Sequence, residues 1–250
     1  MTRRDNEWVA DHFDAHAVER TPAGVENAAR VLFAPFRHEP GTTKRCAAIL
    51  GEKELSRAER FLSPEAEARF LQRRAFRRYC GALALGSRQP LADIAFSETD
   101  KGRPYLQSAP NYSFSFSASR SGFLGACSRT HKVGVDFEDK SRSLEAIELA
   151  ERYFSSAEAQ AVRCAQGKAF EEMFYRLWSL KEAALKSIGE GLPFGLDAFQ
   201  FELTPHPHLA RTPREHGAPT RFEAYEIEDA EFCGALVMNS GPSSPDPMPL

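Results

Sequence analysis

Cysteine is scarce in this sequence, and nothing in its spacing suggests cross-links. The five cysteines are scattered over 250 residues, form an odd set and include no Cys-x-x-Cys pair. A disulfide framework is therefore not expected, and reduced thiols of this kind are typical of a cytoplasmic protein. The chain also needs no such cross-links, because 250 residues with 42% hydrophobic content can bury a substantial core.

Long apolar runs and a surplus of positive charge are missing as well. No stretch approaches the roughly 20 apolar residues of a membrane helix, and acidic residues interrupt the N-terminal region where a signal peptide needs an apolar segment. The 32 Lys and Arg against 35 Asp and Glu give a net charge of -3. We expect no membrane span and no nucleic-acid partner, and any site for a polyanion must be local.

Hydrophobic periodicity predicts an α+β fold of helices packed on antiparallel strands. Helical spacing covers residues 56–85, with an early interruption at Pro64, and then 144–165 and 168–189. Strand-like patterns cover 31–36, 94–106, 111–117, 123–127, 132–138, 194–203 and 221–237. Residues 240–250 are rich in Pro, Gly and Ser, which predicts a disordered tail.

The first of these helices carries a row of arginines. Arg69, Arg73 and Arg77 recur every four residues, with Arg74 and Arg78 beside them. Such a row is either a solvated helix face or a phosphate-binding face, since guanidinium groups bind phosphate bidentately. A nucleic-acid module is the least favoured interpretation, because the row has no interleaved aromatic residues.

Two carboxylates share one face of the strand over 132–138. Alternation places Asp136 and Glu138 on one side and Val133, Val135 and Phe137 on the other. Like charges this close are costly unless solvent or a cation relieves them. The face is therefore either solvated or a metal site, and hard oxygen ligands select Mg²⁺.

The helix over 174–188 carries a second polar column, formed by Trp178, Glu182 and Lys186 at a spacing of four. Taken alone, Glu182 and Lys186 would be an exposed ion pair that contributes about 0.3 kcal/mol to stability. The joint pattern of an acidic strand pair followed by this helix, which ends in Gly189-Glu-Gly-Leu192, favours a functional site.

Together the two motifs resemble those of the Sfp-type 4'-phosphopantetheinyl transferases. That family carries a V-G-[IV]-D-[ILV]-E strand, which stands here as Val133–Glu138, and an F-x-x-x-W-[ST]-x-K-E-[AS]-x-x-K helix, here Phe174–Lys186. The resemblance extends to Lys101-Gly-Arg-Pro104 and to residues 191–199, and it covers most of 31–238. Two motifs in the right order make it specific.

The resemblance implies a fold and an activity. The fold is two similar α+β halves related by a pseudo-twofold, residues 1–131 and 132–239 followed by the tail 240–250, with coenzyme A in the cleft between them. The activity is Mg²⁺-dependent transfer of 4'-phosphopantetheine from coenzyme A to a serine of an acyl or peptidyl carrier protein, which releases 3',5'-ADP. The chemistry fits the residues, since phosphoryl transfer depends on positioning and charge neutralisation.

The resemblance also assigns site residues by position. Asp136, Glu138 and Glu182 correspond to the Mg²⁺ ligands, and Lys181 and Lys186 fall near the pyrophosphate. Glu182 is the candidate general base for the carrier serine, and Lys186 would offset charge on the leaving oxygen.

The nucleotide side of the site is assigned in the same way. Arg57 and Arg69 fall where the family binds the 3'-phosphate, and the nucleotide is held at the positions of Lys101, Gly102, Arg103 and Pro104. Ser115 and Ser117 occupy the hydroxyl positions of a serine-histidine-serine motif, but Phe116 replaces its histidine, which contacts a coenzyme A phosphate in the family. Strand alternation places Phe116 with Tyr112 and Phe114, opposite the serines.

The expected partner is a small acidic carrier domain, bound by the chain as a monomer. The surface that binds the carrier domain is expected between Glu151 and Tyr175. This segment combines basic residues with apolar ones such as Phe154 and Phe174. Core packing is the alternative for those apolar residues, and it is favoured more for Phe174. Two rival functions stay open: a non-catalytic family member that binds carrier or coenzyme A, suggested by Phe116, and a different Mg²⁺-dependent nucleotide enzyme.

Overall fold

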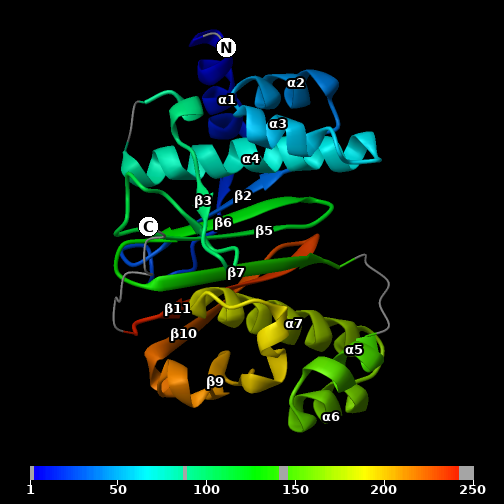
Figure 1. Ribbon diagram of the computed structural model, residues 1–250. Coiled ribbons are helices and arrows are strands. Elements are labelled where there is room, and N and C mark those ends of the chain that lie inside the picture. The colour runs from blue at the N-terminus through cyan, green and yellow to red at the C-terminus, as the bar shows by residue number, and fades with distance from the viewer. Residues whose placement is uncertain (1–2, 87–88, 141–145, 242–250) are drawn as a thin grey trace.

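Two antiparallel sheets lie face to face between two layers of helices (Figure 1). The structure is a computed structural model that describes residues 3–86, 89–140 and 146–241. Helices α1 to α4 cover the outer side of one sheet, and α5 to α7 cover the outer side of the other. The α+β class predicted from the sequence is confirmed.

In its described residues, the N-terminal half combines four helices with a four-stranded sheet of order β1-β2-β6-β5. Its helices are α1 (Arg3–His16), α2 (Pro40–Ala48), α3 (Glu52–Ala58) and α4 (Pro64–Leu85). Its strands are β1 (Val18–Glu19), β2 (Arg30–Pro35), β5 (Ser113–Ala118) and β6 (Gly122–Ser128), with the separate pair β3 (Ser97–Glu98) and β4 (Pro104–Tyr105). The Ser63 side chain caps the start of α4, where Pro64 fits because the first helical position needs no N–H donor.

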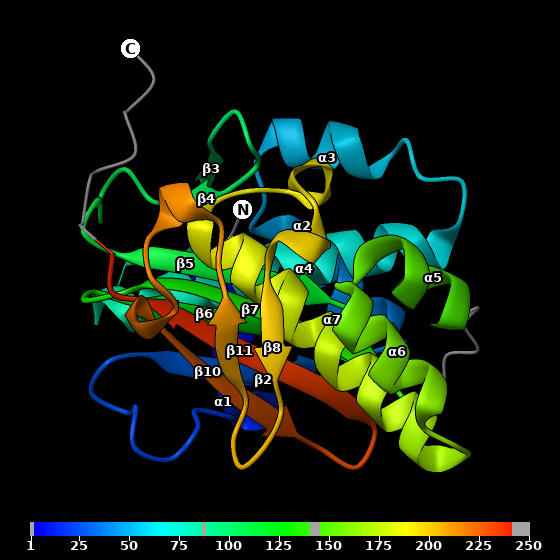
Figure 2. The ribbon, with the colours of Figure 1, turned by 90° about the horizontal axis from the view of Figure 1, so that it is seen from below.

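As far as the structure describes it, the C-terminal half combines three helices with a three-stranded sheet of order β10-β11-β7. Its helices are α5 (Ala146–Tyr153), α6 (Ser156–Cys164) and α7 (Lys168–Ile188). Its strands are β7 (Lys132–Asp139), β10 (Phe222–Glu228) and β11 (Phe232–Asn239), with the hairpin of β8 (Gln200–Glu202) and β9 (His208–Arg211). Seen from below, α7 lies along β7 and β11, with α5 and α6 beside it (Figure 2).

The two halves repeat one topology. In each, a first strand leads to a long helix and then to two further strands, and the last strand pairs between the other two. The order is β2-β6-β5 with α4 in the first half and β7-β11-β10 with α7 in the second. This repeat agrees with the expectation of two similar halves. Strand β7 begins at Lys132, and the boundary at 131/132 stays a prediction.

A hydrophobic core fills the space between the two sheets and is built by both halves. Its members include Val31 and Phe33 of β2, Val135 and Phe137 of β7, and Leu236 of β11, all buried. The alternate residues of the same strands face the helices, which gives each half a second core of its own. Each sheet is therefore apolar on both faces, as expected for the central layers of a four-layer fold.

Several predicted elements differ in extent from those observed. The helical region 56–85 contains two helices: α3 ends at Ala58 and α4 begins at Pro64, in agreement with the predicted interruption at Pro64. The region 144–165 also divides, because Ser155 caps α6. The predicted strand over 194–203 is wrong for most of its length: short 3-10 turns bury Leu196 and Phe199, and only Gln200–Glu202 is strand. The tail expected to be disordered lies, beyond 241, outside the described residues.

No helix in the part of the chain that the structure describes is long and apolar enough to cross a membrane. None of the five cysteines, all of which the structure describes, is in a disulfide.

Candidate active site

Strand β7 carries the acidic pair at the point where helix α7 crosses it. Val133, Val135 and Phe137 are buried between the sheets, so Gly134 and Asp136 face α7. A Cβ at Gly134 would lie 1.9 Å from the carbonyl oxygen of Ala183. Only glycine therefore allows the backbones of β7 and α7 to approach this closely.

This close approach joins Asp136 to Lys186. The Asp136 side chain, 5% exposed, accepts through Oδ1 from Lys186 Nζ at 2.7 Å and from Ser117 Oγ at 2.7 Å. Lys186 Nζ also donates to the carbonyl oxygen of Val135 at 3.1 Å. The other carboxylate oxygen, Oδ2, is buried and has no hydrogen-bond partner among the described residues. A buried, unpaired carboxylate oxygen is costly, and a cation would relieve that cost.

Glu182 belongs to the same electrostatic neighbourhood. Burial, together with the negative charges of Asp136 and Glu138, raises the pKa of Glu182 to about 7, although the charge of Lys186 opposes this shift. The carboxylates of Asp136, Glu138 and Glu182 therefore repel one another. Lys186 is the cation that lowers the pKa of Glu182. Their oxygen chemistry and charge fit Mg²⁺.

The three carboxylates do not already form a cage. In the described ranges, no group of three or more His, Cys, Asp or Glu side chains is arranged to hold a metal ion. Lys186 is placed on the Asp136 oxygen instead. The residues fit the ion by type, charge and an unpaired oxygen, and the ligand assignment stays a prediction.

A cavity of about 140 Å³ lies next to this carboxylate group. It is lined by Arg77, Lys101, Gly102, Arg103, Pro104, Phe114, Ser115, Phe116, Lys186, Gly189 and Glu190. The structure thus brings together seven of the residues assigned from the sequence, from three segments far apart in the chain. Lys186 lines the cavity and contacts Asp136, so it joins the cationic cavity to the carboxylates.

The cations of this cavity are held by contacts across both halves. Arg103 donates to the Ser113 hydroxyl oxygen at 2.7 Å and to the Ser187 carbonyl oxygen at 3.3 Å. Lys101 forms an ion pair with Glu190. The Lys101–Pro104 segment of the first half is therefore fixed to the end of α7, in the second half.

The serines of β5 have a structural role that the sequence did not predict. The hydroxyl oxygens of Ser113 and Ser115 accept from the backbone N–H groups of Val133, at 2.9 Å, and Val135, at 3.0 Å. Ser117 donates to Asp136. These hydroxyls join β5 to β7, so Ser115 borders the cavity with its hydroxyl oxygen bound to the Val135 N–H group.

Phe116 lines the cavity and also packs, partly buried, against the core of the first half. Its partly buried ring packs edge-on against Phe96 at 5.4 Å between centroids. The Arg77 guanidinium lies over the same ring, 5.1 Å from its centroid. The alternation that separates the phenylalanines from the serines is confirmed.

Lys181 is a correction to the predicted site. Its side chain is fully buried, and its Nζ donates to Glu158 at 2.6 Å and to the carbonyl oxygen of Phe199 at 2.6 Å. It points into the core beneath α7, away from Asp136, because it lies one turn from the buried Leu177 and Leu185. Lys181 therefore positions α6 against α7 and cannot contact a pyrophosphate in this arrangement.

Arg57 and Arg69 also lie outside the cavity that holds Arg103. Arg57 packs on the ring of Phe70 and borders a separate cavity with Arg60. Arg69 lies two turns of α4 before Arg77, and it lines a cavity of about 570 Å³ together with Glu138. Its guanidinium donates to Glu65 at 2.7 Å and to the Ser119 carbonyl oxygen at 3.1 Å. The arginine row is thus not a solvated face, and its members serve different cavities.

The docking prediction needs a further correction. Phe154 and Phe174 are both buried, at 5% and 1% exposure, and their rings stack at 5.5 Å. Core packing, the alternative considered for both, is therefore correct for Phe154 too. Among the apolar residues of α5, Ile147 is exposed instead.

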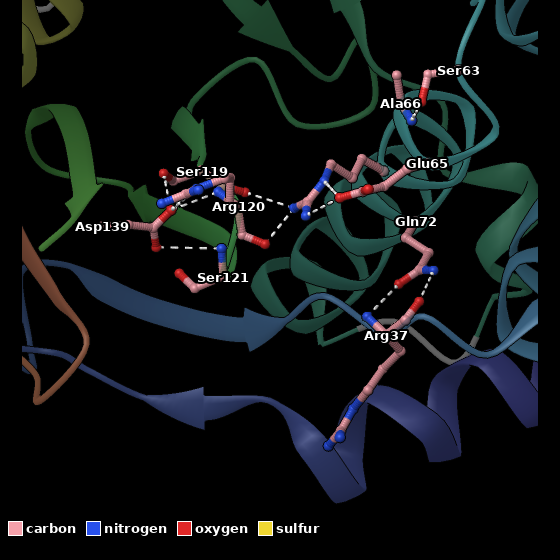
Figure 3. Close-up of polar contacts among 10 residues, drawn as sticks. Arg37, Ser63, Glu65, Ala66, Gln72, Ser119, Arg120, Ser121 and Asp139 are labelled. Carbon is pink, nitrogen blue, oxygen red and sulfur yellow. Dashed lines mark hydrogen bonds and ion pairs between the residues drawn. The ribbon is translucent and has the colours of Figure 1, made fainter. Parts of the chain in front are cut away.

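Asp139 is a site-supporting residue that the sequence did not single out (Figure 3). Buried at the end of β7, it accepts from Ser119 Oγ at 2.6 Å, from Arg120 N at 2.8 Å and from Ser121 N at 3.3 Å. Burial alone would raise the pKa of Asp139, but the hydrogen bonds from Ser119 and Ser121 lower it. The β5–β6 turn is thereby fixed beside the carboxylates. The signal was a serine-rich turn between β5 and β6 and an acid at the end of β7.

Comparisons with known proteins agree with these motifs. A sequence model described as the 4'-phosphopantetheinyl transferase superfamily matches residues 132–237. The chain is 31% identical over 143 residues to 4'-phosphopantetheinyl transferase psf-1 of Bacillus pumilus, covering 56% of this chain and 59% of that protein. It is 31% identical over 198 residues to 4'-phosphopantetheinyl transferase HetI of Nostoc sp., covering 78% of this chain and 80% of that protein. The holo-[acyl-carrier-protein] synthase structure of Thermotoga maritima covers 44% of this chain and 63% of its own chain at 23% identity and a TM-score of 0.36.

Proposed function

Because the chain belongs to the 4'-phosphopantetheinyl transferase superfamily, we propose that it transfers 4'-phosphopantetheine from coenzyme A to a carrier-protein serine. The serine oxygen forms a bond to the phosphorus that bears the pantetheine arm. The bond from that phosphorus to the bridging oxygen breaks, and 3',5'-ADP leaves. The observation that supports this proposal is the contact of Lys186 with Asp136 at the border between the cationic cavity and three carboxylates.

Glu182 is the residue proposed to remove the serine proton. A general base works best when its pKa lies near the working pH, and in the metal-free protein burial and the charge of Asp136 raise the pKa of Glu182 to about 7. A bound Mg²⁺ would lower this pKa. An ordinary exposed glutamate is a weaker base by more than two pKa units. Glu182 takes the proton as the serine oxygen attacks, directly or through a water.

Lys186 and the cavity orient the anionic substrate. Lys186 presents one ammonium group to both Asp136 and the cavity, where it can hold a phosphate oxygen close to the carboxylates. Arg103 and Lys101 add positive charge from the other half of the molecule. The pyrophosphate would therefore lie along the line from this cavity to Asp136.

Asp136, Glu138 and Glu182 would hold the Mg²⁺ ion. When bound, the ion neutralises pyrophosphate charge and stabilises the leaving nucleotide. Two observations support Mg²⁺ at these residues: Oδ2 of Asp136 has no hydrogen-bond partner among the described residues, and the charges of Asp136 and Glu138 raise the pKa of Glu182. The proposed enzyme acts as a monomer in the cytoplasm on acyl or peptidyl carrier domains.

Mass spectrometry of an apo carrier domain tests the proposal directly. The carrier is incubated with the protein, coenzyme A and Mg²⁺, and a covalent mass gain on the carrier serine is expected. Binding of carrier without a mass gain would favour the non-catalytic alternative. Release of 3',5'-ADP without carrier labelling would favour a different nucleotide enzyme. The same assay across fatty acid, polyketide and nonribosomal peptide carriers identifies the physiological class.

A further inference from the structure

Arg77 lies at the centre of a crowded group of cations on α4. Its Nη1 donates to Glu98 Oε1 at 3.0 Å, and Arg74 Nη1 donates to the same oxygen at 3.1 Å. Burial, and then the charges of Arg74 and Arg73, lower the pKa of Arg77 to about 10 although Glu98 opposes them. A further negative charge at this place would therefore be stabilised.

The side chain of Arg77 is held in a fixed orientation. It is 13% exposed, its guanidinium lies over the ring of Phe116, and its Nε is buried with no partner among the described residues. An aromatic ring supports a guanidinium through its face and leaves the edge free for bidentate contacts. Phe116 cannot donate a hydrogen bond, but it can position a residue that does.

The cavity that Arg77 and Phe116 share has the size and charge of a phosphate subsite. Four cationic side chains line it, those of Arg77, Lys101, Arg103 and Lys186. Its volume of about 140 Å³ is below the 300–1,000 Å³ typical of sites that enclose a whole drug-sized ligand. It fits one phosphate group of a larger molecule.

We propose that Arg77, held over Phe116, is an anion-binding residue of this cavity and contacts a phosphate group on the nucleotide part of coenzyme A. The identity of the nucleotide rests on the proposed function. Glu98 competes with that phosphate for Arg77, since both accept from the same guanidinium. Phe116 acts as a positioning residue through Arg77.

Calorimetric titration with 3',5'-ADP, at constant Mg²⁺, measures the contact without any carrier. Arg77→Met is expected to weaken binding about tenfold to a hundredfold, the loss typical of a charge-assisted hydrogen bond. The matched control is Arg30→Met, which removes an arginine that is also ion-paired to a glutamate, Glu19, at 2.8 Å. The control should bind as the wild type does.

A second variant tests the competition and moves affinity in the opposite direction. Glu98→Gln is expected to tighten 3',5'-ADP binding several-fold, and this gain should disappear in the Arg77→Met background. If Arg77→Met fails to fold, Arg77→Gln, which also removes the positive charge but keeps a polar side chain, gives the same comparison with and without Glu98→Gln. Wild-type affinity in the Arg77 variant that folds, or no gain in Glu98→Gln, would overturn the role of Arg77. A lowered melting temperature with unchanged affinity would make it structural.

The experiments distinguish failure of the proposed transferase function from failure of the proposed role of Arg77. If the wild type labels a carrier while Arg77→Met binds 3',5'-ADP normally, the inference about Arg77 is wrong and the transferase function stands. If 3',5'-ADP binding depends on Arg77 but no carrier is labelled, the anion site stands and the transferase function is wrong. Absence of 3',5'-ADP binding in the wild type would overturn both.

Discussion

A single side chain, Glu182, should make the stability of the metal-free protein depend on pH. Its pKa is about 7 in the folded protein against an ordinary value of 4.5, so the folded state favours the protonated form. The stabilisation is complete below about pH 4.5 and is lost as the pH rises through 7. Glu182→Gln should remove this dependence, and the variant should gain about 1–3 kcal/mol relative to the wild type between pH 5 and pH 8. Denaturant unfolding in a chelating buffer measures it, and a constant difference across that range would contradict the burial argument.

Asp136 permits a test of charge at constant shape. Asp136→Asn keeps an oxygen that can accept from Ser117 and Lys186, so the melting temperature should change by only a few degrees, or about 1 kcal/mol. The transfer rate should fall about a hundredfold or more, because the negative charge at the site is lost. Carrier labelling followed over time gives the rate. The control is Asp229→Asn, which changes an aspartate paired with Arg20 outside the site. Wild-type turnover in Asp136→Asn would remove Asp136 from the metal ligands.

The sequence predicted the directions of some of the assigned side chains and not of others. Asp136 and Lys186, which the resemblance assigned to the metal and the pyrophosphate, are in contact, because each lies on a polar face that periodicity defines. Lys181 could have been excluded on the same ground, since it lies four residues from both Leu177 and Leu185 on the core side. Its partner Glu158, and the contact of Arg77 with Phe116, join positions 23 and 39 residues apart, which no local pattern reveals.

The position of helix α7 on strand β7 is set by one glycine. Periodicity predicted both elements but not the distance between them, which depends on a backbone contact between Gly134 and Ala183. Within the motif, Gly134 alternates with Val133 and Val135, and it is the position that faces the helix. The glycine of the strand motif is therefore needed for α7 to pack closely on β7.

Gly134→Ala should damage the site through this contact. A Cβ there would lie 1.9 Å from the Ala183 carbonyl oxygen and 2.5 Å from Ser187 N, so α7 must move. We expect a loss of about 1–3 kcal/mol in unfolding free energy and a large loss of transfer, because Lys186 moves away from Asp136. Gly51→Ala is the control, since its Cβ would meet nothing within 4 Å. Equal activity and stability in the two variants would show that α7 does not depend on this contact.

At the scale of the whole molecule, the repeat of two halves was predicted by resemblance and not by periodicity. The halves share a topology but little visible sequence, because each core tolerates many apolar residues of suitable volume. Their junction was not predictable, since it depends on hydroxyls of β5 that bond to backbone groups of β7. In the sequence, alternating serines indicate a solvent-exposed strand face. In the structure, β7 of the second half covers that face.

The hydroxyl groups of Ser113 and Ser115 should contribute measurably to the stability of the contact between the two halves. Ser113→Ala and Ser115→Ala each leave a buried N–H of β7 without its acceptor, which typically costs about 1–3 kcal/mol, and the double variant should lose roughly the sum. Unfolding in denaturant measures the loss, and Ser56→Ala, at an exposed position on α3, is the control. Amide hydrogen exchange adds a local readout: protection of the Val133 and Val135 amides should fall more than that of amides in β11, which pair within their own sheet. If stability and protection at both valines stayed at the wild-type level, the apolar core between the sheets would hold the halves together without help from the serines.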